Sequence, residues 1–114
     1  MNKNVEIITK ALASKKGEHI LMIDISKLSV IADYFVICDA TNTTLTKTLC
    51  DEVEDKMEEL AGMRPLRKEG YREGRWIVLD YNDVIVHLFL QEEREFYNIE
   101  KLWIDGENAT EYTD

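Results

Sequence analysis

The side chains that could do chemistry in this sequence are its carboxylates, its two histidines and its two cysteines. The 114 residues carry 23 aspartates and glutamates, and six carboxylates fall within residues 51–59. Paired acids on adjacent strands hold the Mg²⁺ ions of phosphoryl transfer. Asp24 is followed two residues later by Ser26, so such a pair is missing there. The acids of 51–59 are expected to form a solvated helix face.

The histidines and cysteines also favour structural roles. Cys38 and Cys50 show no CxxC spacing and are predicted to be buried free thiols. His19 and His87 are not placed to complete a zinc site with them. His87 lies in the most apolar run and is expected to be a hydrogen-bonded histidine in or beside the core. Phosphate-loop, GxGxxG, HExxH and GxSxG motifs are absent from the sequence, so we expect no enzyme, cofactor or metal.

The elements that must position these residues follow from hydrophobic spacing. Val5, Ile8 and Leu12 predict a short amphipathic helix that ends near Gly17. The apolar runs 19–25 and 34–38 predict two strands covered on both faces.

A long helix should follow these strands, because apolar residues recur there near the helical period. Its candidate N-caps are Thr41, Asn42 and Thr43, and Gly62 ends it. The residues expected on its buried stripe are Leu45, Leu49, Val53, Met57 and Leu60.

The second half of the chain predicts a hairpin. Residues 76–79 and 84–90 are β-branched runs joined by a turn that contains Asn82. A weak strand is expected at 66–69, and residues 92–104 show a short helical pattern. Together these features predict one α/β (α+β) domain over residues 1–114. Its parts are a mixed sheet of about five strands, a long central helix, an N-terminal helix and a short helical C-terminal tail.

The bulk charge narrows the class of partner. A net charge of −9 opposes binding to phosphate backbones, so a partner within a ribonucleoprotein should be a basic protein, with little or no direct nucleic-acid contact. The sequence has no apolar stretch of the roughly 20 residues that a membrane span needs, and no signal-peptide pattern at its start. We therefore expect a soluble, cytoplasmic protein.

Three motifs in register resemble the Iojap/RsfS family of ribosomal silencing factors. The opening one is DIS-x-LS-xx-ADYFVI over residues 24–37. The central one begins at Glu69-Gly70 and continues as W-xx-LDY-x-DV-x-VH-x-F over 76–89. The closing one is R-x-FY-x-IE-x-LW over 94–103. Asp39-Ala40 replaces the family's usual Ser-Gly-like pair, and Asn82 replaces its usual turn glycine.

This resemblance implies a translation repressor without a cofactor. Such a protein binds the large ribosomal subunit through its ribosomal protein number fourteen and sterically prevents joining of the small subunit. The aromatic, acidic and basic residues of the central motif are the expected centre of that docking surface. They are Trp76, Asp80, Tyr81, Asp83 and His87, with Glu69 and Lys68 nearby. Structural roles are expected for Asp24, Ser26, Asp33, Arg94, Tyr97 and Trp103.

Two alternative functions remain open from the sequence. Small mixed domains with this order of elements resemble the nucleotidyltransferase fold, so the chain could be a degenerate relative that binds a nucleotide near Asp24, Thr41 and Thr43. The loop before the long helix lacks that fold's Gly-Ser pair, which speaks against catalysis. Alternatively, exposed strand edges could support a homodimer or a scaffold for another basic partner.

Overall fold

The two longest helices begin at asparagine caps, and the second ends at a glycine. The structure, a computed structural model, describes residues 2–113. Helix α1 (Lys3–Ser14) begins after Asn2, whose side chain accepts hydrogen bonds from two backbone amides of the first turn. Helix α2 (Thr43–Ala61) is capped in the same way by Asn42. It ends at Gly62, whose φ of 65° suits a residue without a Cβ.

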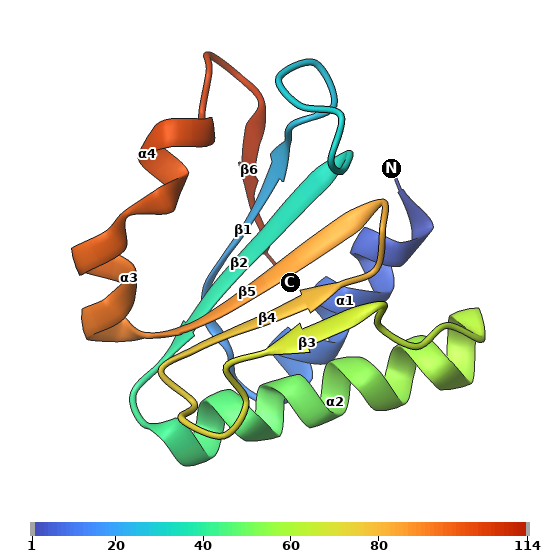
Figure 1. Ribbon diagram of the computed structural model, residues 1–114, viewed down its shortest axis with the longest axis vertical. Helices are drawn as coiled ribbons and strands as arrows, with labels where there is room; N and C mark the ends of the chain where they lie inside the picture. Colours follow the sequence, from blue (N-terminus) through green and yellow to red (C-terminus); the bar gives the residue numbers. More distant parts are fainter. Residues whose placement is uncertain (1, 114) are drawn as a thin grey trace.

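Six strands form one mixed sheet in the order β3-β4-β5-β2-β1-β6 (Figure 1). The strands are β1 (Glu18–Asp24), β2 (Tyr34–Ala40), β3 (Arg67–Glu69), β4 (Trp76–Asp80), β5 (Val84–Leu90) and β6 (Ala109–Glu111). The central pair β2 and β5 is parallel, and all other neighbours are antiparallel. The predicted hairpin of β4 and β5 is confirmed, and Asn82 in its turn has a φ of 76°.

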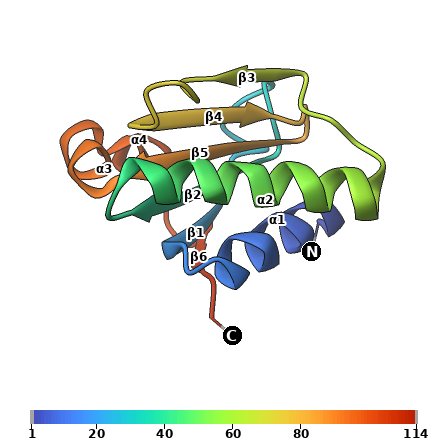
Figure 2. The ribbon, with the colours of Figure 1, turned by 90° about the horizontal axis from the view of Figure 1, so that it is seen from below.

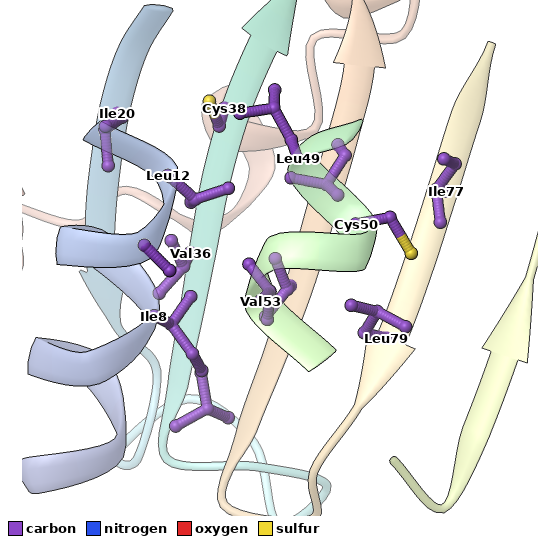
Figure 3. Close-up of a cluster of buried hydrophobic side chains, with 14 of the residues drawn as sticks. Ile8, Leu12, Ile20, Val36, Cys38, Leu49, Cys50, Val53, Ile77 and Leu79 are labelled. Carbon is purple, nitrogen blue, oxygen red and sulfur yellow. The ribbon is translucent and has the colours of Figure 1, made fainter. Parts of the chain in front are cut away.

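The larger core lies between the sheet and the first two helices. Helices α1 and α2 lie side by side on one face of the sheet (Figure 2). Ile8 and Leu12 of α1 meet Leu49 and Val53 of α2 over Val36 of β2 (Figure 3). All five side chains are fully buried. This layer covers one side of the sheet, and a smaller cluster lies on the other side.

The C-terminal part covers only a portion of the second face. Helices α3 (Gln91–Tyr97) and α4 (Ile99–Trp103) follow β5 directly. Ile99 and Trp103 pack on a second cluster that contains Phe35 and Ile37 of β2 and Phe89 of β5. The face near β3 and β4 keeps half-buried side chains.

Two details differ from the sequence prediction. The sheet has six strands rather than about five, because β6 pairs with β1. Its short Ala-Thr-Glu sequence has no hydrophobic alternation, so only the pairing reveals it. Leu60 was expected on the buried stripe of α2 but is 58% exposed. The preceding stripe residue, Met57, is the last of α2 to be fully buried.

Candidate partner-binding surface

Alternation along β4 and β5 sorts the central motif onto two faces. Ile77 and Leu79 point into the core under α2. Trp76, Val78 and Asp80 therefore point to the opposite face and are half-buried. We call this side of β3, β4 and β5, opposite α1 and α2, the open face. A surface of this kind has an apolar centre and a polar rim, as protein interfaces do.

Trp76 lies at the end of the open face nearest α3. Its ring stacks on Phe89 with centroids 4.8 Å apart and meets Tyr97 of α3 at the same distance. Phe96, which is 80% exposed, contacts Tyr97 edge-on. The aromatic surface thus runs from the strand onto α3 without a break. Tyr97 was expected to have a structural role, and its 47% exposure makes it an additional surface residue.

His87 lies beneath this surface rather than on it. It is 8% exposed, and the indole nitrogen of Trp76 donates to its Nδ1 at 3.2 Å. The prediction of a buried, hydrogen-bonded histidine is confirmed. Burial lowers the pKa of His87 from 6.5 to about 4, so the ring is neutral at pH 7 and carries its proton on Nε2. Its hydrogen bond helps to fix the orientation of the Trp76 ring.

Strand β3 divides Glu69 from Lys68. Glu69 pairs with Val78 and Arg67 pairs with Asp80, so these four residues share the open face. Lys68 points to the α2 side, where its Nζ lies 2.8 Å from Glu54 Oε2 and 4.1 Å from the centroid of the Tyr71 ring.

The turn side of the motif has structural contacts. Tyr81 was expected on the surface but is fully buried in the core beneath the helices, so its side chain cannot reach a partner. Asp83 accepts hydrogen bonds from Asn2 and Asn4 at 3.1 Å each, and so ties the start of α1 to the hairpin. Asp80 accepts from the backbone amide of Asn82 at 2.8 Å and also stabilises the turn.

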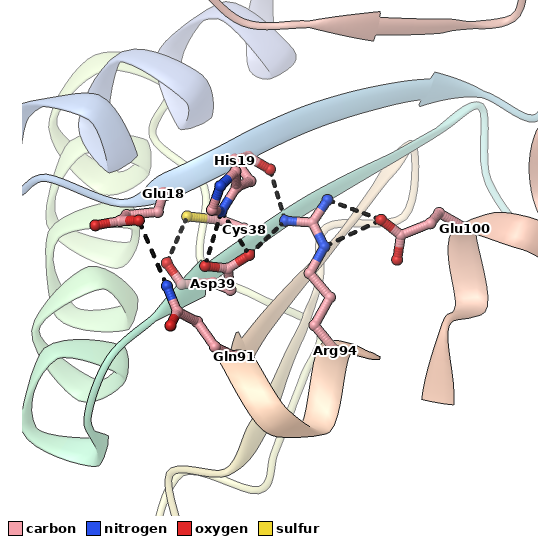
Figure 4. A network of polar contacts seen from close by, with 7 residues as sticks. All are labelled: Glu18, His19, Cys38, Asp39, Gln91, Arg94 and Glu100. Atoms are coloured by element: carbon pink, nitrogen blue, oxygen red, sulfur yellow. Dashed lines mark hydrogen bonds and ion pairs between the residues drawn. The ribbon is translucent and has the colours of Figure 1, made fainter. Parts of the chain in front are cut away.

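A buried ion-pair network holds α3 and α4 against the sheet (Figure 4). Arg94 Nη1 lies 2.9 Å from Asp39 Oδ2 and donates to the carbonyl oxygen of His19 at 2.6 Å. Its Nε and Nη2 both donate to Glu100, at 3.0 and 2.9 Å. The side chains of Arg94 and Asp39 are 11% and 4% exposed. The expected structural role of Arg94 agrees with these contacts.

Among residues 2–113, two groups of side chains have the spacing of metal ligands, and members of both already have other partners. Ligand atoms of Glu18, His19 and Asp39 lie within 4.8 Å of one another, but the Arg94 guanidinium already lies against Asp39. Cys50 groups with Asp51 and Glu54, and Glu54 already binds Lys68. Burial raises the pKa of Cys50 to about 12. A cation at either place would meet a positive charge and, at Cys50, a protonated thiol.

The residues considered for nucleotide binding do not meet. Asp24 ends β1 and pairs with Tyr34 at the start of β2, whereas Thr41 follows the far end of β2. At about 3.3 Å per residue, the seven residues of β2 separate them by roughly 20 Å. Asp24 instead accepts from the backbone amide and hydroxyl of Ser26 at 3.0 and 2.6 Å. The structure therefore forms no shared site from these residues.

Comparisons with known proteins point in one direction. A family model described as "Ribosomal silencing factor during starvation" (RsfS) matches residues 1–114. The ribosomal silencing factor RsfS of Bacillus subtilis is 38% identical over 102 residues, which cover 90% of this chain and 86% of that protein.

Solved structures agree with the sequence comparisons. A crystal structure of a Chromobacterium violaceum protein matches with a TM-score of 0.86 at 31% identity, and covers 90% of this chain and 87% of that one. A crystal structure from Bacillus halodurans matches with a TM-score of 0.82 at 30% identity, with coverage of 95% and 96%. Within residues 2–113, no helix is long and apolar enough to cross a membrane.

Proposed function

The chain belongs to the ribosomal silencing factor (RsfS) family, and from this premise we propose that it binds the large ribosomal subunit at ribosomal protein number fourteen and blocks joining of the small subunit. In this proposal the protein acts in the cytoplasm by steric obstruction and catalyses no reaction. The open face, with Trp76 at its end nearest α3, is the docking surface. Val78, Asp80 and Glu69 complete it on the sheet, and Tyr97 extends it onto α3.

The observation that carries this proposal is the half-buried aromatic surface around Trp76. Stacking on Phe89 and a hydrogen bond to His87 hold the indole in one orientation before binding. A rigid aromatic group loses little conformational entropy when a partner covers it, which is why Trp and Tyr dominate interface energetics. Carboxylates at Asp80 and Glu69 outnumber the one cation beside them, Arg67, which lies 3.8 Å from Glu69, and they suit a basic ribosomal protein.

The size of the molecule supports the steric part of the proposal. The principal extents are 34 × 33 × 28 Å. A standard interface covers about 800 Å² on each partner. A body about 30 Å thick that is held by such a patch would keep two subunit surfaces apart.

Sedimentation of purified subunits with Val78→Arg tests the docking surface. Val78 is half-buried on the open face, and an arginine there adds bulk and a positive charge against a basic partner. Glu69 lies across from it and can pair with the new guanidinium, so the sheet should persist. We expect large-subunit binding to weaken at least about tenfold, and joined ribosomes to recover. Trp76→Ala should weaken binding to a similar degree.

Leu60→Ser is the matched control. Leu60 is an exposed apolar residue of α2, on the opposite side of the molecule, so its loss should leave sedimentation unchanged. Circular dichroism must show all three variants folded. If the folded Val78→Arg variant bound normally, the docking surface would have to lie elsewhere on the molecule. Wild-type protein that travels with neither subunit and leaves joining intact would contradict the proposal as a whole.

A further inference from the structure

A second surface lies on the opposite side of the molecule, between α1 and α2. The two helices form a groove there of about 580 Å³. Ile7 and Ala11 of α1 and Leu60 of α2 line it. Leu60 is 58% exposed, although its neighbours on the same helix stripe are buried. An apolar groove between two parallel ridges has the shape that accepts an amphipathic helix.

The rim of this groove is basic, in contrast to the rest of the protein. Four lysines line it, namely Lys3, Lys10, Lys15 and Lys56, against two acids, Glu6 and Glu52. The whole chain has a net charge of −9. Within the described residues Lys3, Lys10 and Lys15 form no ion pair, whereas Lys56 lies 3.2 Å from Glu59. The lysines of the rim thus outnumber its acids, although Glu6 and Glu52 partly offset their charge.

We propose that this groove binds an acidic amphipathic helix of a partner protein. Apolar side chains of that helix would lie over Ile7, Ala11 and Leu60, and its carboxylates would reach the lysines on the rim. The 12 residues of α1 extend for about 18 Å, which matches three turns of a bound helix. Charge complementarity selects an acidic partner, because a basic helix would face the lysines and an apolar one would leave them unpaired.

This surface is independent of the open face. Helices α1 and α2 cover one side of the sheet, and the open face lies on the other (Figure 2). A molecule docked on the ribosome through Trp76 would keep the groove accessible. The protein could then join an acidic protein to the large subunit, a role beyond steric obstruction.

Titration with a designed peptide tests the groove. The probe is a capped peptide of about 15 residues with leucines at i, i+3, i+4 and i+7 and glutamates between them. A scrambled peptide of the same composition is the control. Amide shifts of ¹⁵N-labelled protein locate the binding, and fluorescence anisotropy gives its strength. We expect saturable shifts in α1 and in the second half of α2 with the patterned peptide, and none with the scrambled one.

Two matched double variants distinguish the effect of the charges in the groove from the effect of the net charge of the protein. Lys10→Glu with Lys15→Glu should weaken peptide binding at least about tenfold. Lys27→Glu with Lys101→Glu makes the same change in net charge outside the groove, and binding should be retained. Equal affinity in both double variants, equal binding of the scrambled peptide, or shifts outside the groove would overturn the proposal. Anionic vesicles that shift these amides when the peptide does not would overturn it as well, as would a dimer of the free protein through α1.

The test is separate from that of the docking surface. Val78→Arg should bind the peptide normally, and the double variant of Lys10 and Lys15 should still sediment with the large subunit. Failure of the peptide experiment alone would therefore leave the ribosome proposal intact.

Discussion

At the scale of single residues, the fold stabilises Trp76 by burying a polar group beneath it. His87 accepts the indole hydrogen bond through Nδ1, and its Nε2 is buried with no hydrogen-bond partner among the described residues. The Phe35 ring lies 4.7 Å away, edge-on. A charged imidazole in this apolar setting would be poorly solvated and would also lose the bond from Trp76.

Acidification should therefore destabilise the protein through His87. Its pKa is lowered from 6.5 to about 4, so the unfolded chain binds a proton below pH 6.5 that the folded chain takes up only near pH 4. The contribution of this group to the free energy of unfolding is largest above pH 6.5. It falls as the pH drops from 6.5 to about 4, by as much as about 3 kcal/mol. Urea denaturation from about pH 7 to about pH 4.5 measures it.

The variant His87→Phe isolates this effect. The phenylalanine cannot titrate, so its stability should depend less on pH than that of the wild type. His19→Gln serves as the comparison for loss of an exposed histidine, although His19 Nδ1 lies 3.1 Å from Asp39 Oδ2. Equal pH dependence in His87→Phe and wild type would show that the histidine does not carry the effect.

Tyr81→Phe should leave the protein equally stable or more stable. The hydroxyl is buried without a hydrogen-bond partner in the described part of the chain, so its removal relieves an unsatisfied polar group. We expect the free energy of unfolding to change by between 0 and about +1 kcal/mol. Tyr71→Phe is the comparison, because Tyr71 donates to Asp51 at 2.9 Å and its loss should destabilise slightly. A loss above about 1 kcal/mol in Tyr81→Phe would contradict this account.

At the scale of elements, the sequence predicted those features that contacts between neighbouring residues determine. The caps Asn42 and Gly62 and the β4–β5 hairpin were readable because neighbouring residues form them. Strand β6 and the burial of Tyr81 were not, because each depends on contacts with distant parts of the chain. The residues of the open face were predicted only in part from the sequence. Alternation from Trp76 would have added Val78 and separated Lys68 from Glu69, but the family motif grouped residues without regard to their faces.

The attachment of α3 and α4 depends on Arg94. Replacing it with methionine leaves Asp39 and Glu100 without their cation, and Asp39 is 3% exposed. We expect a loss of about 3 kcal/mol or more in the free energy of unfolding, with altered near-ultraviolet circular dichroism as Trp103 moves. Adding Asp39→Asn to this variant should restore part of the lost stability.

Arg75→Met is the matched control for this pair. Its partner is Glu93, and Arg75 is 54% exposed, so its loss should cost less than about 1 kcal/mol. Equal losses for the two arginines would mean that the buried network does not anchor the helices.

At the scale of the whole molecule, charge should govern encounter with the ribosome. In the proposed complex, a protein of net charge −9 approaches a basic protein surrounded by RNA, so attraction to the protein is opposed by repulsion from the RNA. Binding measured with isolated ribosomal protein number fourteen contains no repulsion from ribosomal RNA. The affinity of the chain for this isolated protein should fall as the salt concentration is raised from about 0.05 to about 0.5 M at constant Mg²⁺, as measured by titration calorimetry. A flat response would indicate an essentially apolar contact.

The parallel pairing of β2 and β5 determines when this chain can fold during its own synthesis. Tyr34 pairs with Val84, fifty residues further along, so the centre of the sheet cannot close until β5 has left the ribosome. Such long-range pairing is slow because a large loop must close before contacts compensate for it. At about 5–20 residues per second, α1 and β1 wait for several seconds with apolar surface exposed. The centre of the sheet can therefore form only near the end of the chain's own synthesis.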